Sequence, residues 1–163
     1  MFEAHVIESA NKPEFYRELT SQLGGLLTGE RDLIANAANT SALLFQMMPD
    51  LNWAGFYFLR ANDELVLGPF QGRVACVRIA KGKGVCGAAV QRRTSVLVED
   101  VHAFPGHIAC DSASRSELVV PLIAGGRVLG VIDLDSPSVS RFDAEDQSGI
   151  ENVAAIFLAA TDF

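Results

Sequence analysis

The sequence predicts a single α+β domain with a mainly antiparallel sheet flanked by helices. A length of 163 residues suits one domain. Apolar residues make up 49% of the chain and charged residues 20%, which is typical of a soluble protein with a real core. The expected elements run helix, helix, three strands, short helix, strand, long loop, hairpin, helix, so hairpins dominate the sheet. We expect the domain to cover residues 13–163, after a flexible leader over residues 1–12.

Two helices open the predicted domain. The first begins at Pro13, a residue that favours the first helical turn. Its apolar residues recur at helical spacing, interrupted by Gly24 and Gly25. A break over residues 28–30 precedes the second helix, expected over residues 31–48. Pro49 ends that helix, because a proline disfavours helical backbone in the residue before it. The apolar stripe expected on the second helix is Leu33, Ile34, Ala37, Ala38, Leu44, Phe45 and Met48.

The middle of the chain has the composition of strands. Residues 53–59 are rich in aromatic side chains, and a turn at residues 61–63 joins them to a second strand over residues 64–67. Glycine and proline at residues 68–69 indicate a break. A third strand over residues 75–79 follows, then a short helix over residues 85–91 and a short strand over residues 95–98.

The last third combines an irregular loop with a hairpin and a helix. Residues 99–116 show no periodicity, and a loop this long in a compact domain is usually functional. Strands over residues 117–123 and 128–135 surround a turn. The final helix begins near Asp143, where acidic residues suit the positive end of a helix.

The charge balance restricts the partners of the chain. Thirteen basic and 20 acidic residues give a net charge of −7, which disfavours nucleic acid and anionic membrane surfaces. No segment has the roughly 20 mostly apolar residues that span a bilayer, and the N-terminus does not resemble a signal peptide. We therefore expect a cytoplasmic protein whose three cysteines are thiols rather than structural disulfides.

The three cysteines occupy different predicted settings. Cys76 falls in a strand, Cys86 at the start of a short helix, and Cys110 in the irregular loop. A free cysteine is often only a small buried apolar residue. That interpretation is weakest for Cys110, whose polar neighbours would permit a nucleophilic thiol. A zinc site built from the cysteines with His102 and His107 is a rival hypothesis, weakened by the absence of a Cys-x-x-Cys pair.

Three carboxylates are expected to cluster at one end of the last hairpin. Asp133 and Asp135 point to the same face of their strand, because side chains alternate. Pairing across the turn near Gly125 brings Glu117 close to one of them. The cluster is either a solvated strand end, a site for a cationic group, or a place where one carboxyl stays protonated as an acid.

Trp53 and Tyr57 also share one face of a strand. Core packing is the simpler explanation of such a pair. An aromatic wall beside a ligand is the alternative, because a thioether or a cation sits well on aromatic rings. The glycine-rich residues 82–87 lack the full spacing of a phosphate-binding loop, so we interpret them as a turn into the short helix.

These residues together resemble the free methionine-(R)-sulfoxide reductases, small stand-alone GAF-domain enzymes. The resemblance spans nearly all of residues 13–160. The segments that carry it are Asn52–Tyr57, Leu67–Gly72, Ala75–Ile79, Gly82–Gly87, Gly106–Asp111 and Ile132–Ser136. A GAF fold alone would say little, because a fold can host many functions.

The resemblance implies reduction of free methionine-(R)-sulfoxide to methionine without a metal or an organic cofactor. It assigns Cys110 as the attacking cysteine and Cys76 as the cysteine that closes a disulfide with it. Cys86 matches a third cysteine, which could also pair with Cys110. By the same resemblance, Glu117, Asp133, Asp135, Trp53 and Tyr57 form the substrate site. A thioredoxin-type dithiol is the implied reductant and a homodimer the implied assembly. A GAF sensor that binds a small ligand without chemistry remains the alternative.

Overall fold

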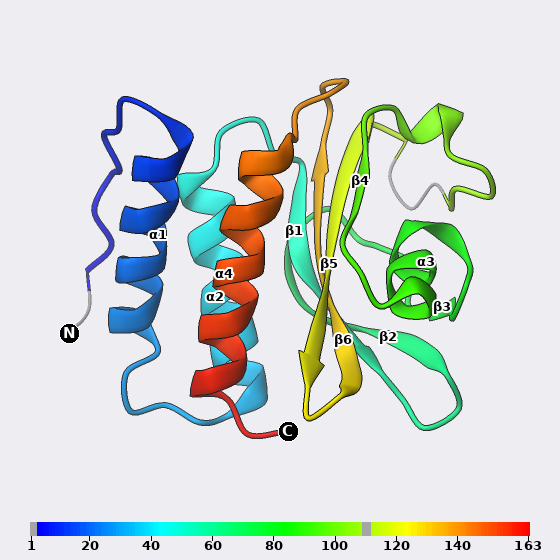
Figure 1. The fold of residues 1–163 in the computed structure, drawn as a ribbon, viewed down its shortest axis with the longest axis horizontal. Coiled ribbons are helices and arrows are strands. Elements are labelled where there is room, and N and C mark those ends of the chain that lie inside the picture. Colours follow the sequence, from blue (N-terminus) through cyan, green and yellow to red (C-terminus); the bar gives the residue numbers. More distant parts are fainter. Residues whose placement is uncertain (1–2, 109–111) are drawn as a thin grey trace.

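A six-stranded antiparallel sheet divides the molecule into two unequal halves (Figure 1). The computed structural model describes residues 3–108 and 112–163. Its sheet has the strand order β3-β2-β1-β6-β5-β4. The elements are α1 (Lys12–Leu26), α2 (Leu33–Met47), β1 (Trp53–Leu59), β2 (Glu64–Gly72), β3 (Arg78–Ala80), α3 (Gly84–Arg92), β4 (Val96–Val98), a 3-10 turn (Val101–Ala103), β5 (Ser116–Ala124), β6 (Arg127–Ser136) and α4 (Ala144–Ala160).

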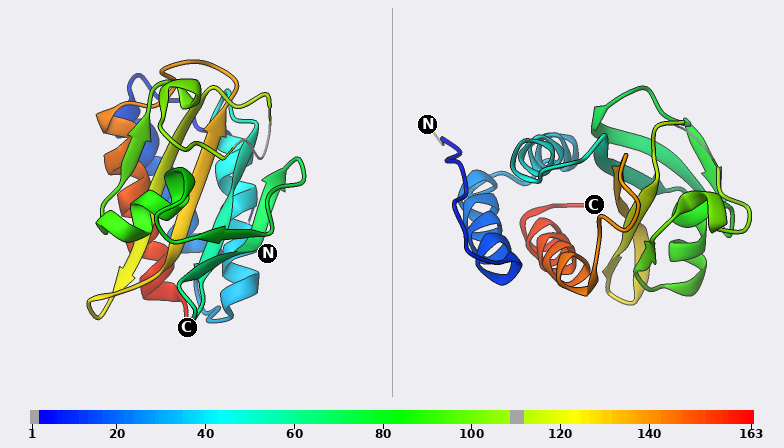
Figure 2. Two further views of the ribbon diagram at one scale, coloured as in Figure 1. Left: turned by 90° about the vertical axis from the view of Figure 1, so that its right-hand side faces the viewer. Right: turned by 90° about the horizontal axis from the view of Figure 1, so that it is seen from above.

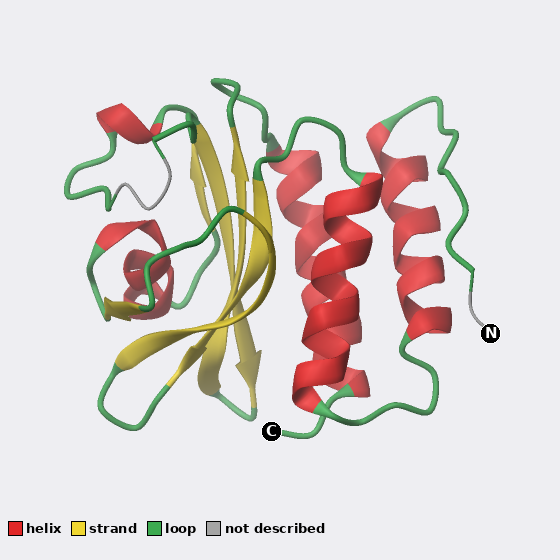
Figure 3. Ribbon diagram, turned by 180° about the vertical axis from the view of Figure 1, so that it is seen from behind, coloured by secondary structure: helices red, strands yellow, loops and turns green. Residues whose placement is uncertain are grey.

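Helices α1, α2 and α4 lie on one side of the sheet and α3 on the other (Figures 2 and 3). Helices α2 and α4 contact the strands directly, and α1 packs on α4 as an outer layer. The predicted α+β class with a mainly antiparallel sheet is confirmed. None of the helices among the described residues has the length and apolar character to cross a bilayer.

Two apolar clusters follow from the alternation of side chains along the strands. In β1, Phe56 and Phe58 face the helices and join the larger cluster, whereas Trp53 and Tyr57 face α3 and join the smaller one. The sheet therefore has one face that only builds the core, and a second face on which aromatic and acidic side chains stand under a single short helix.

The second helix is shorter than predicted, and a different set of its side chains faces the core. Asp32 caps it by accepting a hydrogen bond from the backbone N–H of Ala35 at 2.8 Å. Ile34 is 56% exposed and Phe45 is 36% exposed, and Ala38 is exposed as well, so these three are wrong as core residues. Polar residues take part of the buried face instead. The hydroxyl of Ser41, for example, donates to the carbonyl oxygen of Pro69 on β2 at 3.1 Å.

The second strand does not stop at Gly68 and Pro69, as the sequence indicated. It continues to Gly72, because a β-bulge on this strand takes up the proline. Gly55 of β1 pairs with Phe70 beyond the bulge, and a Cβ at Gly55 would lie 2.4 Å from the Cβ of Phe70. A glycine there is therefore required for the close approach of the two strands.

The predicted strand over residues 75–79 is wrong in its first half. Strand β3 begins only at Arg78, and Cys76 lies in residues 73–77, which form neither helix nor strand. Two backbone carbonyls in this segment accept hydrogen bonds from side chains of β1: Trp53 Nε1 donates to Arg73 and the Tyr57 hydroxyl to Cys76. The carbonyl of Val77 accepts from the backbone N–H of Leu67 on β2 at 3.0 Å. The segment is thereby held across the same face of the sheet as α3.

The first residues also contact the body of the chain. Residues 3–11 form neither helix nor strand. His5 nevertheless exchanges two backbone hydrogen bonds with the side chain of Gln22 on α1, at 3.1 and 2.9 Å. Asn11 caps α1, and Ala4 and Ile7 pack against the larger apolar cluster.

Candidate active site

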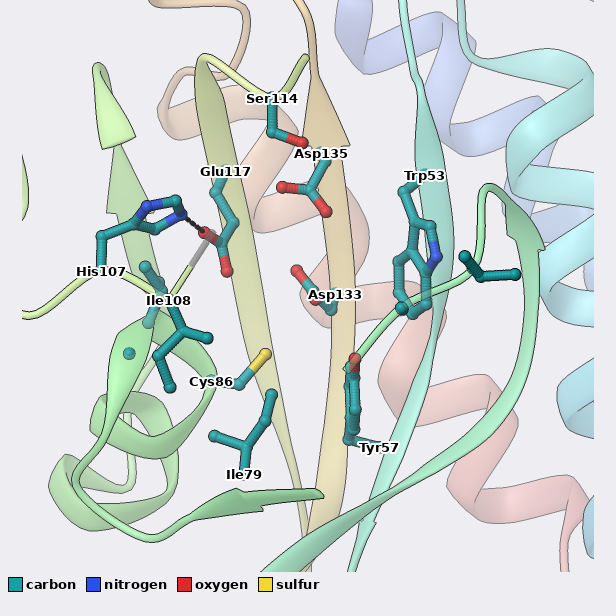
Figure 4. Close-up of a pocket in the computed structure, with 14 residues that line it drawn as sticks. Trp53, Tyr57, Ile79, Cys86, His107, Ile108, Ser114, Glu117, Asp133 and Asp135 are labelled. Carbon is teal, nitrogen blue, oxygen red and sulfur yellow. Dashed lines mark ion pairs between the residues drawn. The ribbon is translucent and has the colours of Figure 1, made fainter. Parts of the chain in front are cut away.

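A pocket with an empty volume of about 510 Å³ opens on the face of the sheet that carries α3 (Figure 4). Strands β1, β5 and β6 form its floor. The start of α3 and the loops before β3 and β5 form its walls. Its described lining is Trp53, Tyr57, Val74, Ala75, Ile79, Gly84, Val85, Cys86, His107, Ile108, Ser114, Glu117, Asp133 and Asp135. The substrate-site candidates expected from the sequence therefore lie around one cavity.

Aromatic rings form one side of the pocket. The rings of Trp53 and Tyr57 stack with centroids 5.8 Å apart and an interplanar angle of 25°. Phe70 of β2 stacks on Trp53 with a centroid distance of 5.2 Å. The Tyr57 hydroxyl donates to the carbonyl oxygen of Cys76 at 2.9 Å, and burial raises the pKa of Tyr57, so that it remains a neutral phenol. The stacking of Phe70 therefore holds the ring of Trp53 in place, and the hydrogen bond to Cys76 holds that of Tyr57.

Carboxyl groups form the opposite side. Glu117 of β5 pairs with Asp135 of β6, and Asp133 stands two residues earlier on the same face of β6. Glu117 and Asp133 are each only 6% exposed. The sequence-based expectation that these groups meet is confirmed, but the solvated strand end is wrong for these two, because both side chains are buried.

Burial determines the protonation of this cluster. It raises the pKa of Glu117 well above the ordinary value, and the nearby charges of Asp133 and Asp135 raise it further. Burial also raises the pKa of Asp133 to about 7, although hydrogen-bond contacts with Cys86 and Glu117 act in the opposite direction. Near neutral pH, the cluster therefore holds at least one protonated carboxyl, which can give up a proton.

Cys86 lies in the first turn of α3, and its side chain reaches the carboxyl cluster from the α3 side of the sheet. It is a free cysteine and is 3% exposed. Its Sγ and one oxygen each of Glu117 and Asp133 all lie within 4.8 Å of one another. Burial raises the pKa of the thiol well above its usual range, and the charges of Asp133 and Glu117 add to this effect. Cys86 is consequently a thiol, not a thiolate, near neutral pH.

His107 joins the site although it was not among the expected substrate contacts. Its Nε2 lies 3.7 Å from Oε2 of Glu117, the contact drawn as a dashed line in Figure 4. Burial lowers the pKa of His107, with a smaller effect from His102. Because the pKa of Glu117 is raised, this contact near neutral pH joins a neutral imidazole to a protonated carboxyl. The polar character of the loop was visible in the sequence, but the direction in which His107 points was not.

Ser114 was also missed as a pocket residue. Its hydroxyl accepts a hydrogen bond from Nδ2 of Asn52 at 3.0 Å, which ties the end of the irregular loop to the residue before β1. Short polar side chains in an aperiodic stretch carry no signal of which way they face.

The other two cysteines are Cys76 and Cys110. Cys76 is half-buried beside the pocket and packs against the smaller apolar cluster. Cys110, expected to be the nucleophile, lies outside the described residues.

The rival zinc hypothesis joined His102 and His107 to the cysteines. Among the described residues, the one group of close metal-ligand atoms is instead Cys86 with Glu117 and Asp133. Closed structural zinc sites use four ligands dominated by sulfur and nitrogen. One buried thiol and two carboxyl groups with raised pKa values do not match that donor set.

Comparison with known proteins places this geometry in a family. The family model described as GAF domain matches residues 17–161. The free methionine-R-sulfoxide reductase of Escherichia coli is 51% identical over 94% of this chain and 94% of its own. The crystal structure of a protein from Burkholderia vietnamiensis, described as a GAF sensor protein, is 57% identical, with a TM-score of 0.89 over 93% of this chain and 96% of that chain.

A third comparison bears directly on the pocket. The X-ray structure of free methionine-R-sulfoxide reductase from Neisseria meningitidis in complex with its substrate superposes with a TM-score of 0.94. It is 43% identical and covers 98% of this chain and 95% of that chain. On this identity and coverage, the chain belongs to the free methionine-R-sulfoxide reductase family of GAF-domain proteins.

Proposed function

We propose that this protein reduces free L-methionine-(R)-sulfoxide to L-methionine. The observation that carries the proposal is the pocket itself. It sets a stacked aromatic pair against a buried carboxyl cluster that holds a proton near neutral pH. Membership of the free methionine-R-sulfoxide reductase family supports the same substrate.

The two sides of the pocket suit the two ends of this substrate. Its methyl group and sulfur suit the faces of Trp53 and Tyr57, because sulfur packs favourably on aromatic rings. Its ammonium group suits carboxylate acceptors, which Asp133 and Asp135 supply. Backbone N–H groups in the loop before β5 are our candidates for the substrate carboxylate.

The carboxyl cluster has a chemical task as well. Attack on the sulfoxide sulfur requires the departing oxygen to gain a proton, so an acid must stand nearby. We assign this role to Glu117, because burial and its acidic neighbours keep it protonated. Asp133, with a pKa of about 7, is placed to share that proton with it.

We assign Cys110 as the attacking thiol. Its sulfur attacks the sulfoxide sulfur and receives the oxygen, which leaves methionine and a sulfenic acid on Cys110. The thiol of Cys76 then condenses with that sulfenic acid to form a disulfide and water. A low-potential dithiol such as thioredoxin reduces the disulfide and restores both thiols. Electrons and oxygen balance in this scheme without a metal or an organic cofactor.

The cell compartment and the assembly follow from the same chemistry and from the family. The cycle depends on thiols that are kept reduced, which favours a cytoplasmic location. We also propose a homodimer that pairs through α1 and α4, where an open groove runs between the two helices. Sedimentation velocity of the reduced protein measures the assembly directly, and a monomer at micromolar concentration would contradict it.

The decisive experiment follows the loss of each epimer separately. The reduced protein is incubated with free methionine-(R)-sulfoxide or with the S epimer, using dithiothreitol as reductant, and methionine is quantified by chromatography. We expect turnover of the R epimer only, and none by the Cys110→Ser variant. No methionine from the R epimer with the wild-type protein would contradict the proposal.

A sensor function is the alternative, favoured by the similarity to the Burkholderia protein, which is described as a GAF sensor. A sensor would bind the sulfoxide or another small ligand in the same pocket without consuming it. Calorimetry separates the two, because a sensor gives saturable heat with no methionine formed, whereas the reductase forms one methionine per enzyme even before reductant is added.

A further inference from the structure

Cys86 stands apart from the other two cysteines because of what surrounds its sulfur. Figure 4 shows its side chain reaching from the start of α3 toward the carboxyl groups of Glu117 and Asp133. The three groups lie within 4.8 Å of one another, and all three are buried. A thiol in such a position can donate its S–H to a carboxylate oxygen.

The two oxygens of Asp133 are in unequal positions. The carboxyl group has hydrogen-bond contacts with Cys86 and Glu117. Its Oδ1, by contrast, is buried without a hydrogen-bond partner within the described part of the chain. A buried acceptor without a partner is unfavourable, so the pocket lacks a donor at this point. An ammonium group or a protonated sulfoxide oxygen is a donor of the required kind.

The surroundings of Cys86 disfavour a redox role for it. A thiol attacks as the thiolate, and the neighbours of Cys86 oppose its ionisation. The side chain is also closed off from any protein reductant. The chemistry does not need it either, because two thiols supply the two electrons that reduce one sulfoxide.

We propose that Cys86 is a positioning residue that remains a thiol throughout the reaction, donating its S–H to Asp133 and so aiming the free oxygen of Asp133 at the substrate. This proposal rests on the proposed function for the identity of the substrate and excludes the option that Cys86 pairs with Cys110. The other titratable groups that face the contact are Tyr57 from β1, Glu117 from β5, Asp135 from β6 and His107 from the loop.

The test compares Cys86→Ala, which removes the donor, with Cys86→Ser, which keeps one. We expect Cys86→Ala to lower kcat/KM by roughly ten- to a hundred-fold, as for loss of a hydrogen bond to a charged group. We expect its acidic limb in the pH profile to move upward, since Asp133 loses a donor that lowers its pKa. Cys86→Ser should recover most of the loss and the wild-type profile. Equal impairment of both variants would overturn the proposal.

Thiol mapping tests the redox part separately. The wild-type protein is oxidised with one equivalent of substrate, denatured and alkylated. We expect Cys86 to be alkylated and the other two cysteines to be protected. Cys86 found in a disulfide, or thioredoxin recycling lost in both variants with a complete single turnover, would contradict the proposal.

A third measurement is independent of activity. In the Cys76→Ser/Cys110→Ser variant, Cys86 is the only thiol left in the chain. Its infrared S–H stretch should lie at the lowered frequency of a donating thiol and should rise when Asp133→Asn is added, whereas Glu99→Gln on the surface should leave it unchanged. An S–H stretching frequency that stays the same in Asp133→Asn would overturn the proposed contact between Cys86 and Asp133. Thus a wild-type protein without turnover contradicts the proposed function, while this measurement still decides the role of Cys86.

Discussion

Two buried aspartates on opposite faces of the sheet show how differently this fold treats the same side chain. Asp146, near the start of α4, has no exposed surface, and four groups satisfy it. Lys12 Nζ contacts it at 2.6 Å and the Tyr16 hydroxyl donates to it at 2.7 Å. Arg141 approaches to 3.4 Å and the backbone N–H of Asp143 donates at 2.9 Å. This aspartate joins α1 to α4.

Asp133 is buried almost as deeply but receives none of these partners. Among the described residues that line its pocket there is no lysine and no arginine, and its Oδ1 has no hydrogen-bond partner. A buried charge without a counter-charge is costly, and such sites are common where a group must bind or react. The contrast separates a carboxylate that stabilises the fold from one that, by our proposal, is available to the substrate.

The largest expected effect comes from replacing Glu117, which we propose as the proton donor of the carboxyl cluster. Glu117→Gln keeps the shape but cannot act as an acid. We expect kcat/KM for free methionine-(R)-sulfoxide to fall roughly a thousand-fold, within the range for general acids, while the free energy of unfolding stays the same or rises. Steady-state kinetics and urea unfolding measure the two quantities. Glu99→Gln, an exposed change, is the matched control. A variant with near wild-type kcat/KM would exclude Glu117 as the acid.

The opposite result is expected for the satisfied aspartate. Asp146→Ala leaves Arg141 and Tyr16 without their partner and should lower the free energy of unfolding by about 3 kcal/mol. We choose the lower end of the known range because the side chain of Lys12 is 35% exposed and can turn into solvent. The folded variant should retain its kcat.

The control for that variant is Asp162→Ala, which breaks the exposed ion pair with Arg31. Its cost should be far smaller than that of Asp146→Ala, because water screens an exposed ion pair. Equal destabilisation by the two changes would show that burial does not distinguish them, and the comparison with Asp133 would lose its basis.

Most of the fold on the helical side was predictable because its signals are periodic. The apolar spacing of α1 and α4 and the alternation in β1, β5 and β6 gave these elements to within a residue or two. The errors fell where tertiary contacts replace local preference. A bulge lets Pro69 remain in β2. Residues 73–77 are held by the side chains of Trp53 and Tyr57 and by one backbone hydrogen bond from Leu67, not by a continuous strand pairing.

The candidate site was predictable to the extent that it depends on strand alternation. That rule placed Asp133 with Asp135, and Trp53 with Tyr57, each on one face. It could not tell that Glu117 and Asp133 are buried, since burial depends on α3 and on the loop that closes over them. Strand alternation also could not predict which way the side chain of Cys86 points, because its sulfur reaches the cluster only through the position of α3 over the sheet.

A change in the substrate tests the same cluster without touching the protein. In N-acetyl methionine sulfoxide, a neutral amide replaces the ammonium group, so the charge-assisted hydrogen bonds to the carboxylates are lost. Each such bond is worth about 1.5–3 kcal/mol. Losing two should lower kcat/KM roughly a hundred-fold or more relative to the free amino acid under the same reductant. Comparable values for the two substrates would show that the cluster does not bind the amino group.

The comparison of the two faces is most direct in the response of stability to pH. Burial raises the pKa of Asp133 to about 7 in the folded protein, against 3.8 in the unfolded chain. Its contribution to stability is therefore complete below pH 3.8 and is lost as the pH rises toward 7, at no more than about 1.4 kcal/mol for each pH unit. At the start of α4 the sign reverses: the hydrogen bond from Lys12 lowers the pKa of Asp143 to about 2, so its contribution is lost as the pH falls from 3.8 toward 2. Urea unfolding across this range should therefore show that Asp133→Asn flattens the decline between pH 4 and 7, whereas Asp143→Asn changes only the acid side. If the dependence of unfolding free energy on pH were unchanged in Asp133→Asn, the Asp133 carboxyl would already be ionised in the folded protein at pH 4. Its burial would then not keep it protonated.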